Sequence, residues 1–416
     1  MTDTLASTTP TTATDNRDAA DARPAVAPRV GLALLALAAG GFAIGTTEFV
    51  TMGLLPEVAA GTGTDIPTAG HYVSAYALGV VVGAPLVAVL ATRLPRKAVL
   101  IALMAAFTLA NTASGFAHGY TELMAARFLS GLPHGAFFGI GSLVAASLVA
   151  KERRTWAVAM MLIGLGTANI VGVPVTTVLG QRLGWAVPYW AVGGIGLLTV
   201  LALWAWVPRQ PRTQEASMRS ELTALTRLQV WLALLVGVVG FGGMFATYAY
   251  ITPTMTELAG FSSSFVPVIL GVYGVGMVSG MVVSGRVARF GILRGMIVSL
   301  GLIAVMLAVF GWLAHYPVLA VAMVFVLGFL PSILVPLLQT RLMDVAHEGQ
   351  SLAAALNHST LNIANAIGAG VGSVVLGAGL GYEWPSRVGA VLAVLGVGIA
   401  LLSALVGRRR PYALEA

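Results

Sequence analysis

Long apolar stretches alternate with short polar connections along almost the whole chain. The stretches have about 20 residues or more, the length that a helix needs to cross the hydrocarbon core of a bilayer. Because a backbone in lipid must satisfy its own hydrogen bonds, continuous apolar runs of this length predict transmembrane helices. The pattern predicts twelve spans, at residues 31–59, 69–92, 98–117, 122–149, 155–180, 187–207, 230–257, 265–285, 295–313, 318–340, 352–379 and 387–407.

The composition agrees with lipid as the solvent. Of the 416 residues, 57% are hydrophobic and only 9% are charged, against about 25% charged in a typical soluble domain. There is no cysteine, and none of the six histidines forms an H-E-x-x-H motif, so the sequence predicts no disulfide, metal site or other cofactor. It contains no G-x-x-x-x-G-K-[ST] motif for nucleotide phosphates, so we do not expect this chain to hydrolyse ATP.

The basic residues are concentrated in alternate loops. If the N-terminus is cytoplasmic, 20 of the 23 Lys and Arg residues lie on the cytoplasmic side, Arg182 and Arg387 lie outside, and Arg127 lies within a span. The positive-inside rule therefore predicts a multi-pass protein of the inner (plasma) membrane with both termini in the cytoplasm. Because the basic residues follow the loops and form no continuous face, the net charge of +7 does not indicate nucleic acid as a partner.

The second half of the chain repeats the first. A shift of 196 residues aligns the run Ala168, Asn169, Gly172 and Val175 with Ala364, Asn365, Gly368 and Val371. A shift of 197 residues pairs identical residues elsewhere: Pro56 with Pro253, Gly63 with Gly260, Tyr76 with Tyr273, Gly79 with Gly276, Gly83 with Gly280, Gly131 with Gly328, and Gly184 with Gly381. We therefore predict an all-α membrane protein with twelve transmembrane helices in two six-helix bundles related by a parallel repeat. This arrangement resembles the major facilitator superfamily, in which the substrate site lies near the midplane between the halves.

The repeat also divides the chain. Residues 1–29 are rich in Thr, Ala and Asp and are expected to be a disordered cytoplasmic tail, without the pattern of a cleavable signal peptide. The first six-helix bundle is predicted at 30–207 and the second at 230–407, joined by a cytoplasmic central loop at 208–229. Residues 408–416 are expected to form a cytoplasmic tail.

One carboxylate, Glu48, lies deep inside a predicted span. The other fifteen acidic residues fall in tails, in loops or near the ends of spans. A charged residue at this depth is costly and usually faces an aqueous cavity, a partner or a proton path. Glu48 is therefore a candidate for picking up and releasing a proton, and the alternative is a permanently paired structural group.

Two motifs of the first half carry a closer resemblance. The sequence T-T-E-F-V at 46–50, followed by G-L-L-P at 53–56, resembles the first span of the drug and sugar efflux branch of the superfamily. This branch includes bacterial chloramphenicol-resistance and arabinose-type efflux permeases. Arg127 and Gly131 resemble an Arg-x-x-x-Gly motif of the family, whose arginine is implicated in proton coupling.

An arginine keeps its proton, so Arg127 is expected to act by biasing a neighbouring carboxylate. The alternative is a structural brace between helices. His134 shares a helix face with Arg127 and Gly131. It is a candidate proton carrier or substrate ligand, or a structural residue that is only hydrogen-bonded.

The loop after the second span resembles the family pattern G-x-L-A-D-R-x-G-R-K in altered form. Arg93, Arg96 and Lys97 match this pattern, whereas Thr92 replaces its acid and neither glycine is present. The resemblance implies a cytoplasmic gate between the halves that these three residues help to form. Alternatively, they only set the topology.

The fifth span contains Gly172 and Pro174 in a sequence that resembles the glycine-and-proline motif of antiporters. Small residues let helices approach closely, and the proline frees backbone carbonyls and can kink the span. The resemblance implies a conformational role for both residues, and the alternative is generic close packing.

Polar and aromatic side chains elsewhere are candidates for contact with a substrate. His358, Asn362 and Asn365 form a polar stripe on the eleventh span, which must face water or another helix. An aromatic wall for a lipophilic substrate would come from Phe137, Phe138, Tyr248, Tyr250 and Tyr273, unless these residues only pack against their neighbours.

The resemblance implies a monomeric, proton-coupled exporter of a small, lipophilic, drug-like molecule, which works by alternating access in the bilayer. A proton is favoured over sodium because the candidate site has one acid, one arginine and one histidine, whereas a sodium site more often shows several converging oxygen ligands. Export of a hydrophilic solute such as a sugar or nucleoside, and uptake by proton symport, are alternatives. From other classes, a membrane sensor is disfavoured by the short loops, and an enzyme by the lack of a nucleophile–base or metal constellation.

Overall fold

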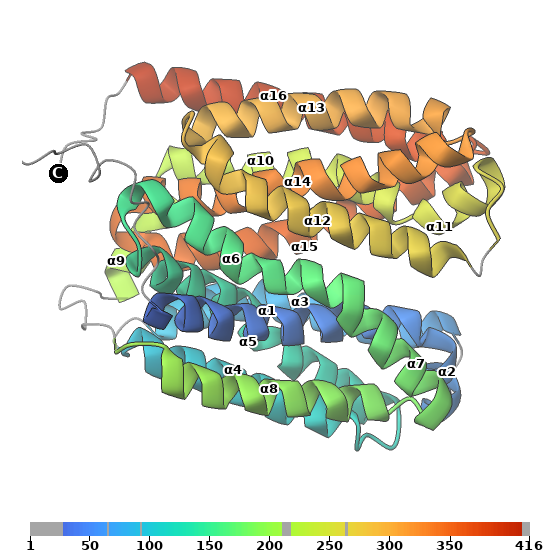
Figure 1. Ribbon diagram of the computed structural model, residues 1–416, viewed down its shortest axis with the longest axis horizontal. Helices are drawn as coiled ribbons and strands as arrows, with labels where there is room; N and C mark the ends of the chain where they lie inside the picture. The colour runs from blue at the N-terminus through green and yellow to red at the C-terminus, as the bar shows by residue number, and fades with distance from the viewer. Residues whose placement is uncertain (1–27, 65, 92–93, 210–217, 263–264, 410–416) are drawn as a thin grey trace, which may run out of the picture.

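The computed structural model describes residues 28–64, 66–91, 94–209, 218–262 and 265–409. Within these residues the chain is helical, and its long helices form two bundles (Figure 1). The first bundle contains α1 (Pro28–Gly53), α2 (Leu55–Thr62), α3 (Ile66–Leu90), α4 (Arg96–Ser114), α5 (Tyr120–Ser147), α6 (Arg154–Thr167), α7 (Val173–Leu183) and α8 (Val187–Trp206). The second contains α10 (Leu228–Tyr248), α11 (Ile251–Pro253), α12 (Val266–Ala288), α13 (Ile292–Leu313), α14 (Pro317–Ala346), α15 (Gln350–Gly377) and α16 (Trp384–Arg409).

Each predicted span corresponds to a long helical segment. Ten segments of the described residues are long and apolar enough to cross a membrane, and one of them, Pro317–Leu376, contains both α14 and α15. These helices are separated by a sharp turn at His347, whose φ is 52°. The shorter apolar segment His71–Val87 lies in α3, which completes the set of twelve. The predicted all-α membrane fold is therefore confirmed.

Three spans are less regular than the apolar pattern predicts. The first is broken at Leu54 (φ −120°, ψ 21°), because Pro56 has no N–H with which to continue the helix. The seventh is broken within one residue of the repeat-related position, at Tyr250 (φ −112°, ψ 20°). In the fifth, a π-helical turn at Ala168–Gly172 precedes Pro174, and the Val173 N–H bonds to the Ala168 carbonyl.

Closely packed glycines make the repeat visible in three dimensions. A Cβ on Gly131 would collide with the Tyr76 carbonyl, and a Cβ on Gly328 would collide with the Tyr273 carbonyl. Glycines at 79 and 83 similarly press α3 against α5, as glycines at 276 and 280 press α12 against α14. Each pair is related by the same 197-residue shift, so the two bundles pack these helices in the same way.

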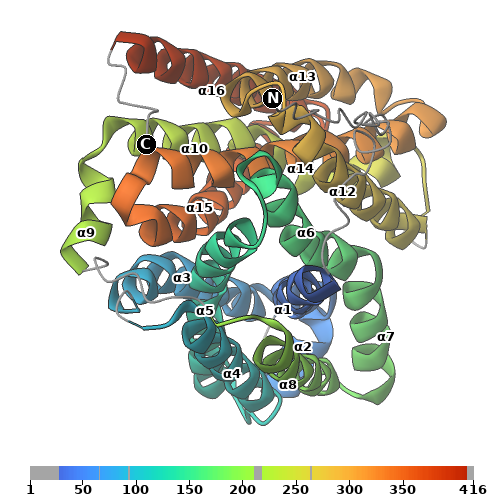
Figure 2. The ribbon, with the colours of Figure 1, turned by 60° about the vertical axis from the view of Figure 1, so that its left-hand side comes forward.

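Two further short segments connect the bundles at one end of the molecule: α9 (Met218–Leu222) and the 3-10 helix η3 (Thr223–Thr226). This end also holds most of the described basic residues, and we call it the arginine-rich end: Arg96, Lys97, Lys151, Arg153, Arg154, Arg219, Arg227, Arg286, Arg289, Arg294 and Arg341. In Figure 2, α9 lies beside α3 and below α10.

The bundles contact each other through α3, α5 and α6 of the first and α12, α14 and α15 of the second. Close contacts lie near the middle of α12, where a Cβ on Gly274 would be 2.6 Å from Ile170, and also toward the arginine-rich end. A Cβ on Gly139 of α5 would lie 2.7 Å from the Ala355 N of α15, and one on Gly285 of α12 would lie 2.8 Å from the Trp156 Cβ of α6. Ala84 of α3 forms a small buried cluster with Leu352 and Ala355. The bundles are therefore closed against each other at this end.

Candidate functional site

Arg127 is held inside the first bundle by side chains from several helices. It is fully buried on α5. Its Nη1 donates to Thr47 Oγ1 at 2.9 Å, and its Nη2 donates to the Thr47 carbonyl at 3.1 Å. Its Cζ lies 4.5 Å from the ring centroid of Tyr76 and 5.6 Å from that of Tyr189, within the range of attraction between a cation and a ring face. Contacts from α1, α3 and α8 thus fix the guanidinium in place.

Thr47 extends this network to α4. Its hydroxyl donates to Asn111 Oδ1, and Asn111 Nδ2 donates to the Phe107 carbonyl at 2.8 Å. One turn along α1, Thr51 shares a 3.0 Å hydrogen bond with the Tyr189 hydroxyl. The predicted arginine motif therefore has a supporting set of polar side chains that the sequence did not single out as site residues.

Glu48 follows Thr47 on α1 but, within the described residues, its carboxylate makes no hydrogen bond or ion pair. Its side chain is half-buried. The charge of Arg127 acts on it through space. The structure thus brings the predicted acid and the predicted arginine near each other without pairing them directly.

His134 connects this region to the second bundle. Its Nδ1 shares a 3.0 Å hydrogen bond with the Tyr76 hydroxyl, and Tyr76 also lies beside Arg127. The His134 ring centroid is 5.4 Å from that of His358 on α15. Phe138, one turn along α5, stacks on His358 with centroids 4.4 Å apart and planes at 12°. Two predicted histidines from different bundles and one predicted aromatic therefore meet where the bundles touch.

Two buried nitrogens in this region lack a hydrogen-bond partner in the described part of the chain: Arg127 Nε and His358 Nε2. Buried polar groups are usually hydrogen-bonded, and each exception requires an explanation. The His358 nitrogen lies where the bundles touch, whereas the Arg127 nitrogen lies inside the first bundle.

The predicted aromatic wall is only partly assembled. Tyr248 and Tyr273 stack with centroids 4.4 Å apart, and Phe138 faces the second bundle as described above. Phe137 lies against Gly40 of α1, because neighbouring residues of a helix point in different directions. Both phenylalanines are fully buried.

The remaining candidates on the second bundle lie further from His134. Tyr250 packs against Gly372 of α15. Asn362 is half-buried and donates to the carbonyl of His358 on its own helix at 3.0 Å. Asn365 is also half-buried, and within the described residues its amide makes no hydrogen bond. The polar stripe of α15 thus begins at the contact between the bundles and continues away from the arginine-rich end.

The candidate gating residues have separate environments. Arg93 lies outside the described residues. Lys97 donates to the Trp204 carbonyl of α8 at 2.6 Å, a contact within the first bundle. Gly172 packs against Thr46 and Phe42 of α1, which leave no room for a side chain, whereas Pro174 is exposed. Arg96 is half-buried, and its charge acts on Glu221 of α9.

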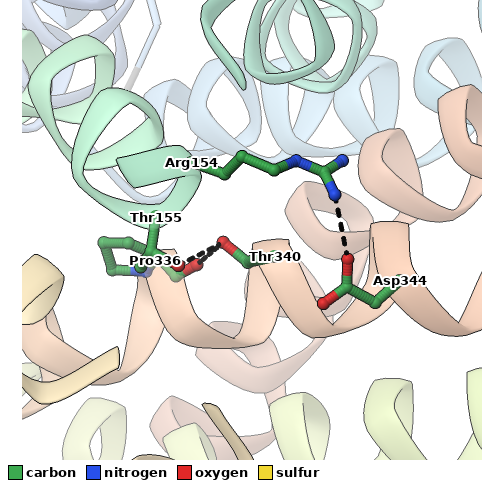
Figure 3. Close-up of polar contacts among 5 residues, drawn as sticks. All are labelled: Arg154, Thr155, Pro336, Thr340 and Asp344. Atoms are coloured by element: carbon green, nitrogen blue, oxygen red, sulfur yellow. Dashed lines mark hydrogen bonds and ion pairs between the residues drawn. The ribbon is translucent and has the colours of Figure 1, made fainter. Parts of the chain in front are cut away.

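A polar contact across the bundles lies at the arginine-rich end (Figure 3). Arg154 Nη1 of α6 lies 3.3 Å from Asp344 Oδ1 of α14. Beside this ion pair, Thr155 donates to the Thr340 hydroxyl at 3.1 Å, and Thr340 donates to the Pro336 carbonyl at 2.8 Å. A cavity of about 490 Å³ lies against these groups, lined by Lys151, Glu152, Arg154, Thr155, Ala288, Arg289, Ile292, Thr340 and Asp344.

Comparison with known proteins gives one consistent family. Residues 37–369 match the Major Facilitator Superfamily. The chain is 42% identical over 385 residues to the inner membrane transport protein YdhP of Escherichia coli K12, covering 92% of this chain and 97% of that one. It is 32% identical over 371 residues to a chloramphenicol resistance protein of Streptomyces lividans, covering 88% of this chain and 95% of that one.

A solved structure shares the fold. The crystal structure of the human organic anion transporter MFSD10 superposes with a TM-score of 0.74, covering 90% of this chain and 99% of that one. The two sequences are only 14% identical.

Proposed function

Because the chain belongs to the Major Facilitator Superfamily and is a multi-pass membrane transporter, we propose that it exports a small, lipophilic, drug-like molecule in exchange for protons. In this proposal it acts as a monomer in the inner membrane. Both termini and the central loop lie in the cytoplasm, and substrate reaches a site between the two bundles by alternating access.

The observation that carries the proposal is that the two charged side chains within the first bundle have different surroundings. Arg127 is fixed by Thr47, Tyr76 and Tyr189, whereas Glu48 makes no hydrogen bond or ion pair within the described residues. A carboxyl that is free of partners can change its protonation state without breaking a structural bond. The permanent charge of Arg127, held near it, interacts differently with its ionised and neutral forms.

The closure of the bundles at the arginine-rich end supports alternating access. Besides apolar contacts, this end contains one ion pair and one pair of hydroxyls between the bundles. These polar groups can bond to water when the bundles separate, as a rocking motion of one bundle against the other requires.

A lipophilic substrate is supported by Phe138, whose ring stacks on His358 where the bundles touch. The relative from Streptomyces lividans is named for resistance to chloramphenicol, which favours the same class. The half-buried amide of Asn365, which makes no hydrogen bond in the described residues, favours a second candidate, a hydrophilic solute such as a sugar or nucleoside.

The substrate class is tested with a deletion strain and an overexpressing strain, grown on a panel of antibiotics, sugars and nucleosides. We expect tolerance to a lipophilic antibiotic to fall on deletion and rise on overexpression. A shift confined to sugars or nucleosides would select the hydrophilic alternative. The compound identified is then followed in proteoliposomes, where an imposed pH gradient should drive its accumulation, and collapse of the gradient with an ionophore should abolish it. Accumulation that persists without the gradient contradicts proton coupling.

The orientation is tested with reporter fusions. Fusions at Arg212 and near the C-terminus should show no periplasmic activity, whereas a fusion within residues 61–70 should show it. The reverse pattern would overturn the proposed topology.

A further inference from the structure

Glu221 of α9 is the most deeply buried carboxylate among the described residues. It is 4% exposed, although it lies in the short segment between the bundles and outside the membrane spans. The proposed transport mechanism gives it no role. A buried acid requires hydrogen bonds or a nearby charge to offset the loss of water, so its surroundings indicate its role.

The Glu221 carboxylate caps the first turn of α15. Its Oε2 accepts the Leu352 N–H at 2.9 Å, and both the N–H and the hydroxyl of Ser351 bond to the same carboxylate. The first N–H groups of a helix have no partner within the helix. The residue at the N-cap position, Gly349, has no side chain with which to supply one, so the carboxylate from α9 does so.

Gly349 shows how closely the connecting segment covers this helix end. A Cβ at this position would lie 2.5 Å from the Glu221 carbonyl oxygen and 2.6 Å from the Ala224 Cβ. The segment and the start of α15 therefore fit together only because residue 349 has no side chain.

The same segment contacts the first bundle. Helix α9 packs against α3 as well as against α15 (Figure 2), and the charge of Arg96 at the start of α4 acts on Glu221. Leu352, which Glu221 binds, is buried against Ala84 of α3. The segment thus lies over the line along which the two bundles meet.

We propose that residues 218–226 form a strap that holds the first turn of α15 against α3 while the arginine-rich end is closed, with Glu221 as its positioning residue. His358 lies less than two turns along α15 from Leu352, so the strap also sets the position of His358 against Phe138. The inference rests on the alternating-access part of the proposed function and is independent of the substrate and the coupling ion.

The strap depends on the accepting oxygen of residue 221 more than on its charge. Burial raises the pKa of the Glu221 carboxyl, so the neutral form is reached nearer to neutral pH than for an exposed glutamate. An amide keeps an accepting oxygen in the same place. Glu221→Gln should therefore retain the strap, whereas Glu221→Ala removes the cap altogether.

The test uses the purified full-length protein in detergent, without substrate. Because the sequence has no cysteine, Ser359→Cys gives a single thiol at a site that is buried where α15 meets Val81 of α3. In this background, Glu221→Ala should raise the rate of labelling by a hydrophilic maleimide about tenfold, as expected for loss of a buried hydrogen bond. Glu221→Gln should stay within about twofold of the parent.

Glu348→Ala is the matched control, because Glu348 lies at the same end, just before α15, but is exposed. It should label at the parent rate. Gly349→Ala displaces the strap without changing Glu221 and should also accelerate labelling, so it replaces Glu221→Ala if that variant does not accumulate. The inference is overturned if Glu221→Ala and Gly349→Ala label at the parent rate. It is also overturned if Glu221→Gln and Glu348→Ala accelerate labelling as much as Glu221→Ala does. Because no substrate is present, a failure of proton coupling leaves this result unaffected.

Discussion

At the scale of single residues, the two charged side chains within the first bundle, Arg127 and Glu48, differ in whether they can lose their charge and in whether they have bonding partners. Arg127 keeps its charge and is surrounded by an accepting hydroxyl, an accepting carbonyl and two ring faces. Glu48 can become neutral, and within the described residues it has no such partners. One charge is thus permanent, and the other is available for a transport cycle.

The first prediction concerns Glu48. Glu48→Gln has nearly the same volume and imitates the protonated form, so it should fold and reach the membrane. It should lose accumulation driven by a pH gradient in proteoliposomes, while downhill exchange of substrate is retained. Glu48→Asp should couple partially, with a displaced pH optimum. Uphill transport by Glu48→Gln at the parent rate would exclude Glu48 as the proton site and make His134 the leading candidate.

The second prediction concerns Arg127. Arg127→Lys keeps the charge but loses the planar group that bonds Thr47 through two nitrogens, so the uphill transport rate should fall by about tenfold or more at normal expression. Arg182→Lys, an exposed position on α7, is the control and should transport normally. If Arg127→Ala accumulates poorly in the membrane but the purified protein transports normally, Arg127 is a structural brace.

The charged residues of this site were predictable from the sequence. The polar side chains of the hydrogen-bond network around Arg127 were not. A carboxylate or arginine inside an apolar span is conspicuous because it is costly. Thr47 and Asn111 are less conspicuous, since short polar side chains in a helix can bond to their own backbone. Tyr76, which contacts both Arg127 and His134, was noticeable in the sequence because it is repeated at Tyr273. The repeat indicated a shared position in the two halves but did not indicate these contacts.

At the scale of helices, the apolar pattern predicted the spans but not their interruptions. Hydropathy depends on side chains, whereas the break at Leu54 and the π-helical turn before Pro174 are changes in backbone hydrogen bonding. The prolines were visible in the sequence. Whether a proline breaks a span or only shifts its hydrogen bonds depends on the neighbouring helices.

The third prediction tests the packing of α3 against α5. A Cβ on Gly79 would collide with the Phe128 carbonyl, and neither backbone can move without displacing the helix. Gly79→Ala should therefore destabilise the protein by about 1–3 kcal/mol, measured by thermal unfolding in detergent. A Cβ on Gly301 of α13 meets nothing within 4 Å. Gly301→Ala should be neutral or slightly stabilising because alanine favours the helix. Equal stability of the two variants would contradict the packing argument.

At the scale of the whole molecule, the repeat accounts for the fold but not for the chemistry. The 197-residue shift places Phe245, Val324 and Pro331 where the first half has Glu48, Arg127 and His134. Val324 is fully buried in the core of the second bundle. The two bundles therefore pack alike, while the charged groups of the candidate site belong to the first bundle.

The bundle architecture was predictable because lipid restricts a chain to few solutions. The contacts between the bundles were not, because they depend on the conformation in which the transporter is found. Nothing in the sequence pairs Arg154 with Asp344, which are 190 residues apart and lie on different bundles. This pair is therefore the place to test how the whole molecule changes state.

The last prediction concerns that ion pair. Its side chains are 25% and 34% exposed, so solvent screens the interaction and the pair alone stabilises the closed state only slightly. Asp344, however, interacts with three positive charges, those of Arg154, Arg341 and Lys151. Without the charge of Asp344, these cations repel one another across the two bundles. Without the charge of Arg154, Asp344 still attracts two cations.

Asp344→Asn should therefore open the arginine-rich end more than Arg154→Gln does. With the Ser359→Cys reporter, we expect labelling to rise about two- to fivefold for Asp344→Asn and less for Arg154→Gln. The charge-swapped variant, with Arg154→Asp and Asp344→Arg together, should not restore the parent rate, because the new arginine at 344 faces Lys151 and Arg341. Full restoration by the swap would show that the pair acts alone, and that the surrounding cations do not contribute to closure of the two bundles.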